Sequence, residues 1–145
     1  MLIYRGNMKK KRTPQQETEW WRKKCVKLAK DISKQRDGYR CCYCHVGKPQ
    51  RQMHSHHIFH EGMFKAMSAD IDNLITLCAM HHQGGMWMKS AKGFNFHNSP
   101  RESTEWVMET YPERYNILKE RSKVLVNLGL DYWKDKHEGL KELCK

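Results

Sequence analysis

Apolar side chains recur at the spacing of an α-helix across residues 14 to 37. They form one stripe, made up of Trp21, Cys25, Leu28 and Ile32. The segment opens with the signals of a helix start, because Thr13 is a good N-cap, Pro14 suits the first helical position and Gln16 completes a capping box. Gly38 marks the end of the segment. We therefore predict one amphipathic helix over residues 14 to 37.

Two shorter segments have the composition of β-strands. The first, residues 52 to 59, carries paired histidines, and the second, residues 73 to 77, is apolar and runs straight into Cys78. We expect a helix directly after Cys78. A cysteine-rich turn between Arg40 and Gly47 fits a knuckle at the tip of a β-hairpin. The pattern predicts strand, loop, strand and helix around one site.

The C-terminal part of the chain has the pattern of three helices. Residues 99 to 102 form a capping box with proline at the first helical position, and they predict a helix through about Tyr111. A second helix is expected over residues 112 to 128. A third, capped by Asp131, has one stripe made up of Trp133, His137, Leu140 and Cys144. We interpret these helices as scaffold or as an oligomer surface.

The length of 145 residues suits one domain with extensions, and the mixture of segments predicts the α+β class. The parts are a basic arm over residues 1 to 13, the helix over 14 to 37, a core rich in cysteine and histidine over 38 to 98, and C-terminal helices over 99 to 145. Hydrophobic residues make up 39% of the chain, so the apolar core is thin and a bound metal would strengthen it.

The net charge of +11 is concentrated near the N-terminus. Residues 1 to 40 contribute +9, residues 41 to 97 contribute +2, and the remainder is neutral. Such a block suits a polyanion, and DNA is the partner we expect. The alternatives are a solvated helix face or a nuclear-import-like run. The candidate phosphate contacts are Lys9, Lys10, Lys11, Arg12, Arg22, Lys23, Lys24 and Lys27.

The six cysteines are expected to be reduced, because Cys41 and Cys42 are adjacent and no signal-like apolar segment opens the chain. We therefore expect a cytoplasmic protein, in which Cys25 and Cys144 are buried or incidental thiols. The sequence holds no run of eighteen apolar residues, so a membrane span is not expected.

Two pairs of metal-binding side chains have the spacing of a structural zinc site. In each pair two residues separate the donors, which lets a tight turn chelate the ion. The predicted ligands are Cys41, Cys44, Cys78 and His81. Cys42 and His45 are alternative donors from the same turn.

The order of these residues resembles that of the HNH endonuclease family. The resemblance covers residues 39 to 97 and consists of Cys-x-x-Cys, a histidine pair before isoleucine, and Asn-Leu-x-x-Leu-Cys followed by the helix histidine. Residues 36 to 41 resemble the entry to the knuckle in phage-type members, and residues 96 to 98 resemble their tail. The basic N-terminal helix is similar, more loosely, to that of phage recombination proteins of the NinG kind. The resemblance implies a small treble-clef-like ββα-metal core that grips one divalent cation.

By position, the resemblance implies a role for each residue of the second set. His57 would be the general base, Asn73 would hold the loop and orient the His57 ring, and His56 and His82 would bind the catalytic cation, with His97 as a third ligand. The cation would be Mg²⁺ or Mn²⁺, with Ni²⁺ or Zn²⁺ as alternatives. Imidazole titrates near neutral pH, and a cation neutralises charge on the phosphate, so phosphodiester hydrolysis suits this set.

Three features of the chain test this assignment. Successive residues of a strand point to opposite sides, so His56 and His57 must be splayed if both serve one site. His81 stands where most zinc-bearing members have cysteine, which leaves open whether His81 or His82 binds the zinc. The third ligand often lies four residues after the helix histidine, where this chain has Met86.

The expected function is that of a metal-dependent HNH DNA endonuclease, which nicks or cuts both strands as a monomer or homodimer. A phage origin would place it in the host cytoplasm. The alternative is a non-catalytic zinc-stapled DNA-binding module in phage recombination or packaging. His45, His54 and His60 flank the site and could support its ligands or contact phosphate, and a surface position is the preferred interpretation for all three. His137 is interpreted as a packing residue.

Overall fold

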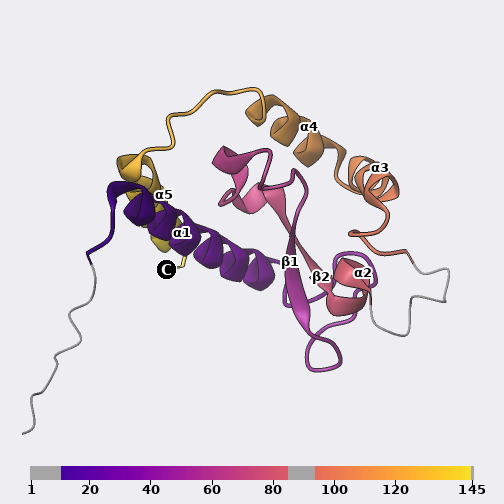
Figure 1. Ribbon diagram of the computed structural model, residues 1–145. Coiled ribbons are helices and arrows are strands. Elements are labelled where there is room, and N and C mark those ends of the chain that lie inside the picture. Colours follow the sequence, from indigo (N-terminus) through magenta and orange to yellow (C-terminus); the bar gives the residue numbers. More distant parts are fainter. Residues whose placement is uncertain (1–10, 85–93, 145) are drawn as a thin grey trace, which may run out of the picture.

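The computed structural model describes residues 11–84 and 94–144. The fold is mixed α+β, and the described residues form five α-helices and one two-stranded antiparallel sheet. The long N-terminal helix and the last helix lie side by side, and the sheet lies at the C-terminal end of the long helix (Figure 1). Among the described residues no helix combines the length and the apolar character that crossing a membrane requires.

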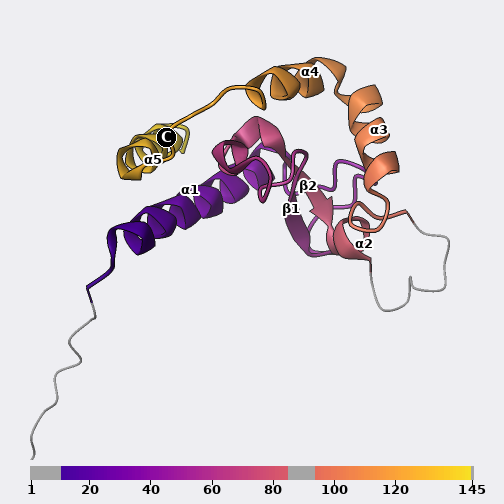
Figure 2. The same cartoon turned by 45° about the horizontal axis from the view of Figure 1, so that its top comes forward.

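Helix α1 (Pro14–Arg36) begins as the sequence predicts. The Thr13 side chain accepts a hydrogen bond from the backbone N–H of Gln16 at 3.2 Å, and the Gln16 side chain accepts one from the backbone N–H of Thr13 at 3.0 Å. Helix α5 (Leu130–Glu142) packs along α1, as both ribbon views show, and closes one of the two hydrophobic clusters of the core (Figure 2). The side chains buried between the two helices include Cys25, Ala29, Trp133 and Leu140.

The sheet pairs β1 (Met53–His57) with β2 (Leu74–Cys78) in antiparallel register, so that His56 lies opposite Ile75. All of β2 is buried. Helix α1 packs against β1 through Ser55, whose hydroxyl donates to the backbone carbonyl of Lys30 at 3.0 Å. This contact places the C-terminal part of α1 against the strand that carries the histidines.

Short elements complete the core around the sheet. The cysteine turn is closed by a bridge between Arg40 and Gly47, as a knuckle at the tip of a hairpin requires. Two 3₁₀ helices, η1 (Lys65–Met67) and η2 (Ile71–Asn73), shape the connection between the strands, and the short helix α2 (Ala79–Gln83) follows Cys78 directly.

The C-terminal helices differ from the prediction in three places. Helix α3 (Pro100–Thr110) begins at the predicted proline, but the Ser99 side chain makes no capping bond, because its backbone is not in the extended conformation that an N-cap needs. Helix α4 (Pro112–Arg121) ends earlier than expected, since β-branched residues in Val124–Leu125–Val126 favour an extended chain over a helix. Gly129, not Asp131, is the residue at the N-cap of α5.

Candidate metal centres

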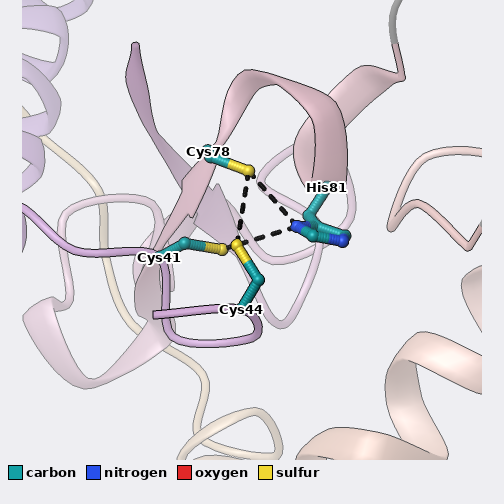
Figure 3. Close-up of side chains that lie close together, drawn as sticks. All are labelled: Cys41, Cys44, Cys78 and His81. Carbon is teal, nitrogen blue, oxygen red and sulfur yellow. Dashed lines mark hydrogen bonds between the residues drawn. The ribbon is translucent and has the colours of Figure 1, made fainter. Parts of the chain in front are cut away.

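The four predicted zinc ligands come together from three elements. Cys41 and Cys44 lie in the knuckle, Cys78 ends β2, and His81 lies in α2 (Figure 3). Their ligand atoms all lie within 4.8 Å of one another. Sγ of Cys44 and Sγ of Cys78 are 3.8 Å apart, and Nδ1 of His81 is 3.2 Å from Sγ of Cys78 and 3.8 Å from Sγ of Cys41.

These distances match the size of a tetrahedral zinc site. With Zn–S near 2.3 Å and Zn–N near 2.0 Å, tetrahedral angles place two sulfurs about 3.8 Å apart and sulfur and nitrogen about 3.6 Å apart. A cluster of three thiols and one imidazole is also a donor set that zinc prefers. The cluster can therefore hold a metal ion such as zinc. Cys42 and His45 lie outside this group of ligand atoms.

The protein groups around the cluster affect its thiols unequally. Burial raises the pKa of Cys41 to about 11. Burial also acts to raise the pKa of Cys78, but the backbone N–H of His81 and the guanidinium of Arg51 outweigh it and lower this pKa. Nη1 of Arg51 lies 3.6 Å from Sγ of Cys78 and 3.8 Å from Sγ of Cys44. The guanidinium thus stabilises the negative charge that three thiolates would bring to a bound ion.

A second group of ligand atoms gathers from His56, His82 and His97, again all within 4.8 Å of one another. His56 comes from β1 and His82 from α2. The backbone N–H of His97 donates to the carbonyl of His82 at 3.2 Å, and the N–H of Phe96 donates to that of His81 at 2.8 Å. These bonds hold Phe96 and His97 against α2 and bring the His97 ring to the site. Met86 lies outside the described residues.

The structure thus separates the neighbours His81 and His82. Successive residues of an α-helix point about 100° apart, so one helix turn can serve two sites. His81 faces the cysteines, and His82 faces His56 and His97, with ring centroids 4.7 Å from the latter.

Burial sets the protonation of His56 and His82, two members of the three-histidine group. It lowers the pKa of His56 to about 3 and that of His82 to about 4, and the neighbouring histidines add to both shifts. Both rings are therefore neutral at pH 7. A neutral imidazole is the form that binds a metal ion, so these two rings can accept a cation without losing a proton.

His57, the last residue of β1, is held by the loop that follows the strand. Its Nε2 lies 2.9 Å from the backbone carbonyl of Ser68. A carbonyl only accepts hydrogen bonds, so Nε2 carries the proton, and Nδ1 of the neutral ring is the basic nitrogen. Burial lowers the pKa of His57, and the Ser68 carbonyl opposes that shift.

His56 and His57 both line a cavity of about 290 Å³, although successive side chains of a strand point to opposite faces. Its lining includes both histidines together with His60 and His97. The cavity lies at the end of β1, where two consecutive side chains border the same space. A small substrate group in this cavity would therefore meet His56 and His97, two members of the three-histidine group, together with the candidate base.

Asn73 is fully buried and holds the loop between the strands. Its Oδ1 accepts from the backbone N–H of Phe59 at 2.7 Å, and its Nδ2 donates to the carbonyls of Phe59 at 2.9 Å and Met67 at 3.1 Å. The predicted role in holding the loop is thus visible in the structure. Asn73 reaches the His57 ring only indirectly, since Met67 precedes the residue whose carbonyl fixes that ring.

His54 was expected at the surface, and this prediction is wrong. Its Nδ1 lies 3.0 Å from Nδ1 of His82, and the ring is half-buried. The signal was present in the sequence, because residues two apart on a strand share a face and His54 is two residues before His56. His60 is exposed but borders the cavity, His45 is exposed as expected, and the ring of His137 packs against Trp21 at 5.3 Å.

The predicted phosphate contacts divide into several environments. Lys9 and Lys10 lie outside the described residues, and Lys11 precedes α1. Arg12 and Lys24 each lie 4.5 Å from the ring centroid of Trp20. Arg22 binds the carboxylates of Glu19 and Glu61. Lys23 and Lys27 are exposed and remain open to a partner.

Comparison of the chain with protein-family models, with curated proteins and with solved structures finds no match in any of the three. The function of the two candidate centres is therefore argued from their own geometry.

Proposed function

We propose that this protein is a metal-dependent endonuclease of the HNH type, which hydrolyses phosphodiester bonds in DNA. The observation that carries the proposal is the three-histidine group of His56, His82 and His97, two of which, His56 and His97, line one cavity with His57. A structure that needed only a staple would gain nothing from a second set of metal ligands. The first set, with its tetrahedral spacing, supplies that staple as a structural zinc site.

The residues at the cavity divide the work of the reaction. A divalent cation held by His56, His82 and His97 would supply positive charge to the phosphate and the departing 3′ oxygen. Nδ1 of His57 takes a proton from the attacking water as its oxygen bonds to phosphorus and the bond to the 3′ oxygen breaks. Ser68 keeps the opposite nitrogen protonated, so the ring presents its basic side throughout.

Plasmid nicking tests this proposal most directly. The zinc-loaded parent should convert supercoiled plasmid to the nicked or linear form with Mg²⁺, Mn²⁺ or Ni²⁺. His57→Ala should reduce the rate by about 10²-fold or more, the range that general bases contribute. His45→Ala is the matched control, because that histidine is exposed and its ring belongs to neither group of ligand atoms. If the parent protein cuts the plasmid with none of the three cations, the proposal that it is an endonuclease is refuted.

A non-catalytic zinc-stapled DNA-binding module is the second candidate. The exposed lysines of α1 and the knuckle would serve such a module equally well. The two candidates differ in the requirement for the histidines. A module of this kind binds DNA in a zinc-dependent manner, shows no nicking, and keeps its affinity in His57→Ala.

A further inference from the structure

One face of α1 borders a groove of about 510 Å³ that is separate from the histidine cavity. The basic residues along it repeat at helical spacing, so their side chains project to one side of the helix. They are Arg22, Lys23, Lys27, Lys30 and Lys34. Lys30 and Lys34 belong to this row, although the phosphate contacts predicted from the sequence did not include them.

The positive charge of the groove is only partly compensated. Arg22 is paired with Glu61 at 3.3 Å, and Lys34 is paired with Asp31 at 3.2 Å. Within residues 11–84 and 94–144, the ammonium groups of Lys23, Lys27 and Lys30 make no ion pair with a carboxylate. Three adjacent cations on one groove are a site for an anionic polymer, because each can replace a counterion of a phosphate.

The groove and the histidine cavity share no lining residue, but two contacts show that they are neighbours. Glu61 lines the groove and the preceding residue, His60, lines the cavity, so the two hollows share one loop. The backbone of Lys30 contacts Ser55, which shares a strand face with His57. A polymer that follows the groove past Lys30 is therefore led to the end of β1, where the candidate base lies.

We propose that this groove binds the sugar–phosphate backbone of the DNA strand that enters the histidine cavity, with Lys23, Lys27 and Lys30 as its phosphate contacts. The inference rests on the proposed function, because it takes DNA as the substrate. From Lys23 to Lys30 the helix rises about 10 Å, at about 1.5 Å per residue, which is enough to follow several successive phosphates of one strand. Lys24 drops out of the predicted set of contacts, since it stacks on Trp20 and Trp21.

The salt dependence of DNA binding tests the groove. We compare Lys27→Gln/Lys30→Gln with a matched control, Lys119→Gln/Lys134→Gln, which removes two exposed lysines from α4 and α5 outside the groove. Binding of a fluorescein-labelled duplex is followed by anisotropy at several salt concentrations. All proteins carry His57→Ala, so that the duplex stays intact, and zinc content and circular dichroism verify folding.

Each phosphate contact makes the slope of log affinity against log salt more negative by about 0.9. The double substitution Lys27→Gln/Lys30→Gln should therefore make the slope less steep by about 1.8. Between 50 and 200 mM salt, the parent should then lose about tenfold more affinity than the groove variant. The control pair should keep the slope of the parent. An unchanged slope in the groove variant, or an equal fall in the control, would overturn the assignment. Failure of plasmid nicking would not, because this measurement needs no cleavage.

Discussion

Replacement of Asn73 by alanine is the sharpest test of how the loop between the strands is held. The substitution removes three hydrogen bonds from a fully buried side chain and leaves the N–H and carbonyl of Phe59 without these partners, while the carbonyl of Met67 still accepts from the backbone N–H of Asp70. At about 1 kcal/mol per bond, Asn73→Ala should lower the free energy of unfolding by about 3 kcal/mol. Asn98→Ala, at an exposed asparagine of the same core, should change it by less than about 0.5 kcal/mol.

Urea denaturation of the zinc-loaded proteins measures this difference, and amide exchange locates it. The Phe59 N–H donates to Asn73 in the parent, so its exchange should accelerate in Asn73→Ala more than that of Leu77 within the buried strand β2. Asn73→Asp should retain part of the protection, because a carboxylate oxygen still accepts from Phe59. A loss of stability below about 1 kcal/mol, or uniform acceleration of all amides, would contradict the assigned role.

Three further predictions concern the metal centres. Removal of zinc by a chelator, or Cys44→Ser, should abolish cooperative unfolding as followed by circular dichroism, since the cluster staples the knuckle to β2 and α2; an unchanged transition would refute a structural ion. His54→Ala should weaken Co²⁺ binding at the three-histidine group by about tenfold or more in an absorbance titration, because His54 orients the His82 ring; affinity equal to that of His45→Ala would show no such role. Without a cation at the three-histidine group, the free energy of unfolding should fall as pH drops from about 6.5 towards 4. In this range histidines bind protons in the unfolded chain, whereas His56 and His82, with pKa values of about 3 and about 4, stay neutral in the folded protein. His56→Gln should show a smaller fall in urea titrations at pH 7.5 and 5.5, and an equal fall would contradict this reasoning.

Local chemistry accounts for the elements that the sequence predicted well. The capping box at Thr13 and Gln16 involves only neighbours in the chain, and the zinc pairs depend on spacing within two short turns, so both could be inferred without the fold. The end of α4 could not, because Lys123 and the residues after it have no strong stop signal and only weak preferences decide the conformation there.

The sequence indicated most residues of the candidate site, but it did not indicate which neighbours hold each side chain. His97 lies close to His82 because its backbone N–H donates to the His82 carbonyl. The periodicity of the sequence gives no sign of such a bond between residues fifteen positions apart. The tautomer of His57 depends on the Ser68 carbonyl, and the environment of Arg22 depends on Glu61, which lies 39 positions away. Such contacts form only in the tertiary structure. Charge and spacing in the sequence could therefore indicate these residues as part of the site, but not the residues that they contact.

The five-residue helix α2 has a consequence for how the protein responds to its surroundings. His81 and His82 are consecutive, so an ion held by the cysteines and His81 would also orient His82 in the other centre. Loss of such an ion, or oxidation of the thiols that would bind it, would release the turn on which His82 lies. The two centres are thus interlocked in one direction, and cleavage would depend on the zinc supply and redox state of the cell even though zinc takes no part in the reaction.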